Sequence, residues 1–260
     1  YISISGDTIP IEYYVTPDKE ENARYEWSKH KKMFAFLEKT LGPYPFPEEK
    51  YGVAGFMWTG GAMENQTITG VGLNLIKGND DMETTYLHEL AHHWWGNSVG
   101  PKSWKDIWLN EGFATYFELL YLIDDGQISS SCEYLRPLNV TVSDISLYNP
   151  PFERMFSGFI YNRGAWVLHM LKYTLGDSLF YKSLQQYYHA FQYKNASTAD
   201  FQKICESVSG RGLLWFFNQY VYTPSDAPMI EYSVSAADGQ SNTYVISFDT
   251  STLSGNMRYG

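Results

Sequence analysis

The sequence METTYLHELAHHWW occupies residues 82–95, and the spacing of its apolar side chains predicts a helix. Positions four apart lie on one face of a helix, so the imidazoles of His88 and His92 can bind the same Zn²⁺ ion. Glu89 does not share that direction and is predicted to point toward the open side of the metal, where water binds. Without a third ligand, the pattern also fits a surface helix with two solvated histidines.

A third metal ligand is predicted in the segment WLNEGFATY, residues 108–116, which also has helical spacing. Glu111 lies in this segment, with eighteen residues between it and His92. Two histidines and one glutamate leave the fourth tetrahedral position open, as in catalytic zinc sites. Water bound to zinc has a pKa of about 7, and Glu89 would accept its proton as the water attacks a carbonyl. These residues predict one catalytic zinc ion per chain.

One further glutamate and the other four histidines lie outside the predicted ligand set. Glu118 lies seven residues after Glu111 and shares its helix face, so it is a candidate hydrogen-bond acceptor for a ligand imidazole. A solvated helix glutamate is an equally good interpretation of Glu118. His93 is out of phase with the ligand pair, which favours core packing or a surface role. The remaining histidines have no ligand spacing and are interpreted as structural: His30, His169 and His189.

Composition limits the class of protein. The chain has 260 residues, of which 44% are hydrophobic, and 22 Tyr, 15 Phe and 8 Trp indicate a globular fold with a large core. A net charge of -10 without a Lys/Arg cluster argues against nucleic acid as a partner. The sequence contains no apolar run long enough to span a bilayer and shows no compartment signal. Cys132 and Cys205 exclude a cysteine metal site, although one disulfide stays possible.

The secondary structure predicted along the chain is mixed. Residues 1–16 read as strands, and residues 18–41 as one amphipathic helix that ends at Gly42 and Pro43. The segment 43–71 is predicted to hold edge strands and loops, with strand-like pieces at 51–56 and 67–71. Further helices are predicted at 82–95, 107–123, 161–175, 177–192, 198–208 and 212–221. MIEYSVSA and TYVISFD, joined by ADGQSN, predict a hairpin after Pro228.

Three motifs together resemble one known family. GGAMEN at residues 60–65, His-Glu-x-x-His at residues 88–92 and WLNEG at residues 108–112 are similar, in order and spacing, to the aminopeptidase N family of gluzincins. That family also contains leukotriene hydrolase. The recognisable stretch runs from about residue 43 to about residue 164, so the helical remainder is compatible with the family without being diagnostic.

The resemblance implies an α+β fold, namely a thermolysin-like catalytic domain with a small mixed β lobe and a mostly α-helical lobe. Family members carry a β domain before it and further domains after it. Residues 1–16 are therefore expected to end a preceding β domain, residues 17–228 to form the catalytic domain, and residues 229–260 to begin a following β domain. Because the chain does not start with Met, we interpret it as a piece of a longer protein.

The resemblance also implies a substrate-binding role for the GGAMEN motif. By similarity, Glu64 binds the free α-ammonium of the substrate, while a glycine-rich edge lets the peptide backbone approach. The expected substrate-binding residues are Gly61, Ala62, Met63, Glu64 and Asn65.

A tyrosine that stabilises the oxyanion is implied in the same way. The family motif is Tyr-x-Lys-Gly, and its nearest match is Tyr161-Asn162-Arg163-Gly164, which makes Tyr161 the candidate. Arg163 replaces the lysine, and the interval from Glu111 is shorter than in the family pattern. Tyr148 and Tyr173 are weaker candidates.

These observations predict a zinc-dependent aminopeptidase that hydrolyses the N-terminal bond of peptides, with zinc-bound water as nucleophile and Glu89 as general base. The expected partners are peptides with a free N-terminus and the flanking domains. Three alternatives stay open: a thermolysin-like endopeptidase, an epoxide hydrolase and a catalytically silent peptide-binding module. Equal cleavage of N-acetylated peptides would favour the endopeptidase.

Overall fold

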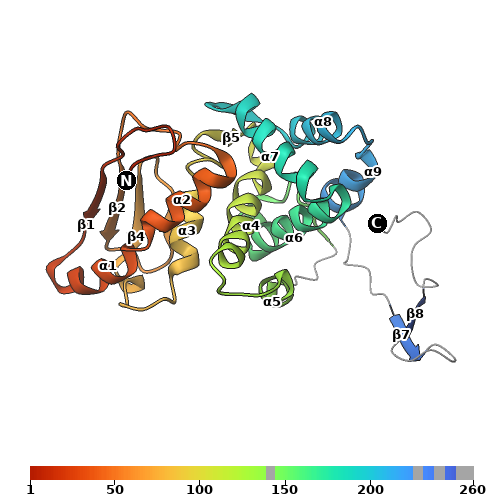
Figure 1. Cartoon of the computed structure of the whole chain (residues 1–260), viewed down its shortest axis with the longest axis horizontal. Coiled ribbons are helices and arrows are strands. Elements are labelled where there is room, and N and C mark those ends of the chain that lie inside the picture. The colour runs from red at the N-terminus through yellow and green to blue at the C-terminus, as the bar shows by residue number, and fades with distance from the viewer. Residues whose placement is uncertain (139–143, 225–230, 237–243, 250–260) are drawn as a thin grey trace.

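A computed structural model describes residues 1–138, 144–224, 231–236 and 244–249 of the chain. Figure 1 shows a small sheet with helices α1 to α3 at one end and a helical part at the other, which confirms a mixed α and β fold. The helices are α1 Glu20–Trp27, α2 His30–Leu41, α3 Glu83–Ala91, α4 Trp108–Asp124, α5 Ser131–Leu135, α6 Gly158–Leu175, α7 Asp177–Phe191, α8 Thr198–Ser209 and α9 Leu214–Phe217. The strands are β1 Ile11–Tyr14, β2 Tyr51–Phe56, β3 Ala62–Met63, β4 Ile68–Gly72, β5 Val99–Pro101, β6 Lys194–Ala196, β7 Glu231–Ala236 and β8 Tyr244–Asp249.

The main sheet has four strands in the order β1-β2-β4-β3. β1, β2 and β4 run parallel, while β3 pairs antiparallel with β4. The expectation of edge strands at 51–56 and 67–71 was wrong, because β2 and β4 lie inside the sheet. Their side chains are buried accordingly, with Tyr51, Val53 and Val71 each 0% exposed, as is usual for parallel strands. The short β3, which lies within GGAMEN, forms the edge.

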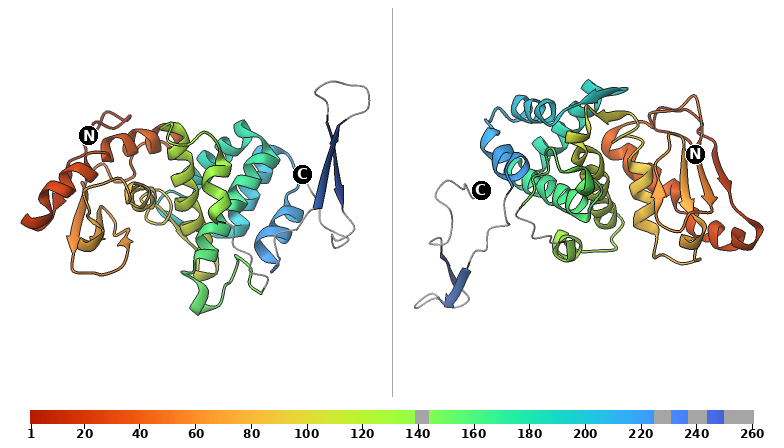
Figure 2. Two further views of the ribbon diagram at one scale, coloured as in Figure 1. Left: turned by 90° about the horizontal axis from the view of Figure 1, so that it is seen from below. Right: turned by 180° about the vertical axis from the view of Figure 1, so that it is seen from behind.

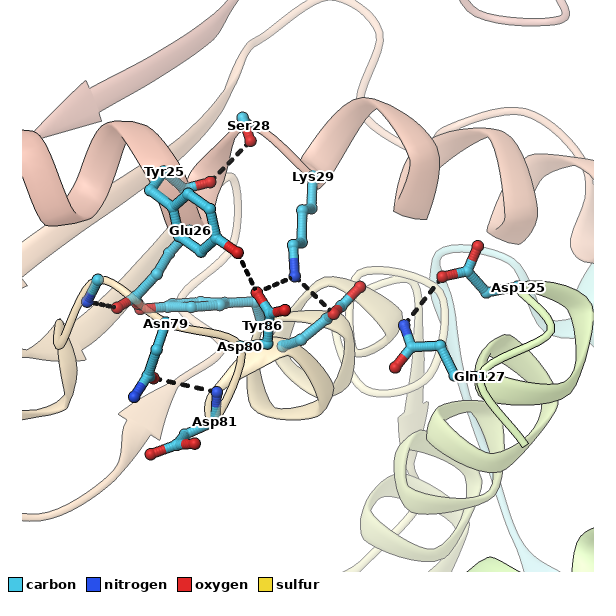
Figure 3. A network of polar contacts seen from close by, with 12 residues as sticks. Tyr25, Glu26, Ser28, Lys29, Asn79, Asp80, Asp81, Tyr86, Asp125 and Gln127 are labelled. Atoms are coloured by element: carbon cyan, nitrogen blue, oxygen red, sulfur yellow. Dashed lines mark hydrogen bonds and ion pairs between the residues drawn. The ribbon is translucent and has the colours of Figure 1, made fainter.

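The stretch predicted as one helix over 18–41 is two helices, α1 and α2, separated at Ser28 and Lys29. The Ser28 hydroxyl donates to the carbonyl of Tyr25 at 2.7 Å, a local side-chain bond that competes with the helical ladder. Lys29 pairs with Asp80 and, at 2.7 Å, with Glu83, so the break between α1 and α2 is tied to the start of α3 (Figure 3). The predicted end of the second helix before Gly42 is confirmed.

Helix α3 ends earlier than predicted. The expectation was 82–95, but α3 ends at Ala91 and His92 is its C-cap. The next backbone donors bind in tighter turns: the His93 N–H reaches Leu90 at 3.1 Å and the Trp94 N–H reaches Ala91 at 3.0 Å. Gly96 then adopts a φ of 130°, which only glycine takes readily, and redirects the chain into β5.

α4 and α6 cross where each carries a glycine. An ideal Cβ on Gly112 would lie 2.7 Å from the Gly164 Cα, and one on Gly164 would lie 2.6 Å from the Gly112 Cα. The two backbones therefore touch, and no larger residue fits at the crossing. α6 begins at Gly158, three residues before its predicted start, so Tyr161 lies in its first turn.

The other predicted helices agree with the structure to within a few residues, except the last one. α5 was not predicted, and neither were β5 and β6, which pair in parallel with each other. The predicted helix at 212–221 is α9 followed by a π-helical turn, Asn218–Tyr222. The hairpin is confirmed, since β7 and β8 pair antiparallel, while its predicted turn lies outside the described residues.

The buried hydrophobic side chains form one core that extends from the sheet into the helical part. Figure 2 shows the sheet part and the helical part side by side from two further directions. Its largest fully buried side chains are aromatic and include Trp27, Trp94, Trp95 and Trp108. Both cysteines are free; Cys132 is exposed and Cys205 is buried. Within the described part of the chain, the helices are too short or too polar to cross a membrane.

Candidate metal and catalytic site

Three predicted metal ligands meet between α3 and α4. Glu111 Oε2 lies 3.4 Å from His88 Nε2 and 3.4 Å from His92 Nε2. One ligand atom from each residue lies within 4.8 Å of the others, so the group could hold one metal ion. Ligand atoms bound tetrahedrally to zinc at ~2.0–2.1 Å would lie about 3.3 Å apart, close to the two observed distances.

The second ring nitrogen of each histidine is held by a hydrogen bond. His88 Nδ1 lies 2.8 Å from Glu118 Oε1, and His92 Nδ1 lies 2.9 Å from the carbonyl oxygen of Trp95. Both acceptors favour a proton on Nδ1, which leaves Nε2 as the donor atom toward the metal. Sequence reasoning anticipated Glu118 as such an acceptor but missed the Trp95 carbonyl, because backbone groups leave no sequence signal.

The charges at this cluster follow from burial and proximity. Burial opposes the charge on each group, but the neighbouring histidines lower the pKa of Glu111 to about 2. Burial likewise opposes the protonated form of His92, yet Glu111 raises its pKa to about 9. Glu111 and Glu118 together raise the pKa of His88 well above its ordinary value, also against burial. The site therefore keeps Glu111 ionised and favours a positive charge between the imidazoles and the carboxylate. A bound divalent cation would supply that charge in place of the ring protons, because ligand histidines bind metal in the neutral form.

Glu89 lies beside the cluster and is 6% exposed. Its Oε2 is buried and has no hydrogen-bond partner in the described part of the chain. Burial raises the pKa of Glu89 to about 7, with Glu64 and Glu111 adding to the shift and His88 and His92 opposing it. A carboxyl with such a pKa can exchange a proton near neutral pH.

A pocket of about 750 Å³ joins this cluster to the GGAMEN segment. Glu64 is fixed there by two asparagines: Asn110 Nδ2 lies 3.4 Å from its Oε1, and Asn97 Nδ2 donates to its carbonyl oxygen at 2.8 Å. Sequence reasoning missed both asparagines. Asn110 belongs to the WLNEG motif, which was a usable signal, whereas the contact of Asn97 depends on the fold alone.

The other residues of GGAMEN divide between two hollows. Gly61, Ala62, Met63 and Glu64 line the main pocket, and Met63 also lines a shallower hollow with Asn65. Gly61 has a φ of 92°, which places it in the region that favours glycine. The structure thus brings four of the five predicted substrate-binding residues to the metal pocket and puts Asn65 beside it.

Tyr161 lines the same pocket, and its ring stacks on that of His88 with centroids 5.9 Å apart. Burial raises its pKa, and Glu111 and Glu64 add to that shift, so the hydroxyl keeps its proton. The weaker candidates lie elsewhere. Tyr148 packs on Tyr222, and Tyr173 is 78% exposed.

The apolar walls of the pocket were not predicted. They include two exposed aromatic side chains in mutual ring contact, Trp104 and Phe156, whose centroids lie 6.0 Å apart. Ile107 and Trp58 complete this part of the wall. Four loops or helix ends contribute these side chains, and such convergence has no signature in sequence spacing.

Comparisons with known proteins point to one family. A model of the peptidase family M1 domain matches residues 25–220. Aminopeptidase 2, mitochondrial, of Saccharomyces cerevisiae is 33% identical over 238 residues, which are 81% of this chain and 24% of that protein. Glutamyl aminopeptidase of Homo sapiens is 31% identical over 230 residues, 79% of this chain and 24% of that protein. The chain thus spans about a quarter of the length of these relatives.

Solved structures show the same relationship. The M1 zinc metallopeptidase from Deinococcus radiodurans has 30% sequence identity and a TM-score of 0.66, covering 77% of this chain and 45% of that one. Aminopeptidase A of Legionella pneumophila, solved in complex with aspartic acid, has a TM-score of 0.76 over 91% of this chain and 29% of that one. At 20% identity, the second likeness concerns the fold alone.

Proposed function

Because the chain belongs to peptidase family M1, we propose that it is the catalytic part of a zinc-dependent aminopeptidase that hydrolyses the N-terminal bond of peptides. One observation carries the proposal: the three potential ligands, a buried glutamate with a pKa of about 7 and the anchored carboxylate of Glu64 share one pocket. The relatives are named as aminopeptidases, and they do not favour an endopeptidase or a silent binding module.

The proposed zinc ligands are His88, His92 and Glu111. Their donor set, two imidazole nitrogens and one carboxylate oxygen, is the one that catalytic zinc sites use. When bound, zinc supplies Lewis-acid chemistry, which polarises a carbonyl and makes water acidic enough to ionise near neutral pH. Glu118 orients the His88 ring from behind through the 2.8 Å contact at Nδ1.

The chain's own residues have separate roles in the proposed reaction. Glu89 takes a proton from the attacking water and delivers it to the departing amine, for which a pKa of about 7 is suited. Tyr161 keeps its proton and donates a hydrogen bond to the oxyanion of the tetrahedral intermediate. Glu64, fixed by Asn110 and Asn97, binds the α-ammonium of the substrate and so limits cleavage to the first bond.

We extend the proposal to the domain arrangement. Residues 17–228 would form a thermolysin-like catalytic domain, with residues 1–16 and 229–260 belonging to flanking β domains, which is in keeping with the quarter of the relatives' length that the chain spans. β1 nevertheless pairs along its whole length with β2, so this strand is part of the main sheet. The proposed partners are peptides with a free N-terminus and those flanking domains.

The general base is tested by Glu89→Gln, which keeps the shape of the side chain but cannot accept the proton. We expect the variant to bind zinc in the same amount as the wild-type chain, measured by metal analysis, and to lose nearly all turnover of aminoacyl fluorogenic substrates. Glu133→Gln, at an exposed helix position, is the matched control. Wild-type turnover in Glu89→Gln would exclude this residue as the base.

The amine anchor is tested with the substrate. A peptide with a free N-terminus should be cleaved, and its N-acetylated form should not, because acetylation removes the charge that Glu64 binds. Glu64→Gln should raise KM for the free peptide, since one charge-assisted contact worth roughly 1.5–3 kcal/mol is weakened. Equal cleavage of both peptides would replace the aminopeptidase with an endopeptidase.

A further inference from the structure

His93 follows the ligand His92 and is 0% exposed. Its two ring nitrogens contact two different parts of the candidate site. Nδ1 lies 3.2 Å from the carbonyl oxygen of Glu89, and Nε2 accepts a hydrogen bond from the Thr67 N–H at 3.1 Å. One side chain therefore joins the backbone of α3, at the predicted base, to the chain that follows GGAMEN.

The chemistry of the two contacts permits a single form of the ring. A backbone N–H can only donate, so Nε2 must carry a free lone pair toward Thr67. A carbonyl oxygen can only accept, so the proton lies on Nδ1 and points at Glu89. The backbone N–H of His93 itself goes to Leu90 at 3.1 Å, so the imidazole, and not that N–H, contacts the Glu89 carbonyl in the last turn of α3.

Thr67 is itself held in a demanding conformation. Its φ is 61°, an uncommon value for a β-branched residue, and it is 4% exposed. Its hydroxyl donates to Glu49 at 2.9 Å, and its carbonyl accepts from Gly52 at 2.9 Å. With the His93 bond, all three polar groups of Thr67 are satisfied, which stabilises this strained conformation.

We propose that His93 is a positioning residue that fixes the distance between the base Glu89 and the amine anchor Glu64. Glu64 lies three residues before Thr67, and the turn between them is closed by the Ile68 N–H, which donates to Asn65 at 3.0 Å. A displacement of Thr67 therefore moves Glu64 relative to α3. The inference rests on the proposed function, because it matters only if these two glutamates act on one substrate.

Two variants with side chains of different length distinguish a positioning role of His93 from a role in packing alone. In His93→Asn the amide can still approach the Glu89 carbonyl but is too short to accept from Thr67, whereas His93→Gln is one methylene longer and can do so. The experiment measures the inhibition constants of leucinamide and of its deamino analogue for the zinc-loaded chain, and their ratio gives the preference for the free amine. This ratio should fall about tenfold in His93→Asn and return to within about threefold of the wild-type ratio in His93→Gln.

His30→Asn is the matched control. His30 is also 0% exposed, and its ring packs on Tyr51 at 5.5 Å, as the His93 ring does at 5.2 Å. Its polar contacts go instead to Trp27 and Tyr13, so the amine preference should stay at the wild-type value. The positioning role is overturned if His93→Asn and His93→Gln behave alike, or if His30→Asn loses the preference equally.

The tautomer provides a test on the wild-type chain that does not depend on any variant folding. Nitrogen NMR of ¹⁵N-histidine-labelled protein should show His93 neutral, with its proton on Nδ1. A proton on Nε2 would overturn the proposal. Failure of the proposed function and failure of the positioning role give different results. A zinc-loaded wild-type chain without turnover contradicts the proposed function. Turnover with an unchanged amine preference in His93→Asn contradicts the positioning role alone.

Discussion

At the scale of single residues, Tyr161 offers a direct test because it adds one hydroxyl to the metal pocket. In Tyr161→Phe the ring that stacks on His88 remains, and only the donor to the oxyanion is lost. Removal of one such donor lowers kcat by about 10²–10³-fold, while KM should change little. Steady-state kinetics check this, with Tyr173→Phe, 78% exposed, as a silent control. A wild-type kcat in Tyr161→Phe would remove Tyr161 from the reaction.

Glu118 is a second residue whose role can be measured apart from turnover. Its Oε1 contacts His88 at 2.8 Å, and its Oε2 accepts from the Tyr134 hydroxyl at 2.8 Å, so the carboxylate is itself held in place. Glu118→Ala should weaken zinc affinity by about 10–100-fold, the usual effect of losing the partner of a ligand histidine. Competition with a chelator measures this. Unchanged affinity would mean that the contact with His88 does not tune the metal site.

At the scale of elements, the crossing of α4 and α6 connects two motifs that sequence reasoning treated separately. Gly112 closes WLNEG and Gly164 closes the tyrosine motif, and their backbones touch. Glu111 lies one residue before the first glycine, and Tyr161 lies one turn before the second. The glycine contact therefore brings the proposed ligand Glu111 and the candidate oxyanion donor Tyr161 to one pocket.

Gly164→Ala tests this connection. The added Cβ would lie 2.6 Å from the Gly112 Cα, so the helices must separate, and overpacking of this kind destabilises by about 1–3 kcal/mol. We expect a lower melting temperature together with a lower kcat, because Tyr161 moves with α6. Gly158→Ala, in the same helix, meets nothing closer than 3.8 Å and should be stable and active. If Gly164→Ala kept wild-type stability and kcat, the close crossing would be unimportant.

The sequence predicted what depends on short spacing and missed what depends on long-range contacts. His88 and His92 are four residues apart, so helix geometry alone places them together, and Glu118 follows from the same reasoning. The break at Ser28 was missed because apolar periodicity continues across it, while the Ser28 hydroxyl bond that competes with the helical ladder there is a local side-chain contact. Asn97 and the aromatic wall were missed because only the folded chain brings them to the pocket.

At the scale of the whole molecule, the net charge of -10 has a local counterpart in the pocket. Four glutamates line it, namely Glu64, Glu89, Glu111 and Glu118, and none of the described residues lining it is Lys or Arg. Trp58, Trp104, Ile107 and Phe156 supply an apolar and aromatic part of its wall. Such a pocket can bind a protonated amine and an uncharged side chain, but none of its described side chains is a Lys or Arg that could pair with a side-chain carboxylate.

The substrate preference should therefore run against acidic N-terminal residues. An unpaired carboxylate brought among like charges loses hydration without a compensating contact, and even ~2.7 kcal/mol of this cost lowers kcat/KM by about 100-fold. We expect leucyl substrates to exceed glutamyl substrates by at least about that factor, measured with matched fluorogenic amides. Trp58→Arg, at a position 42% exposed on the rim, should narrow the gap by supplying a cation. Equal cleavage of both amides by the wild-type chain would contradict this predicted preference.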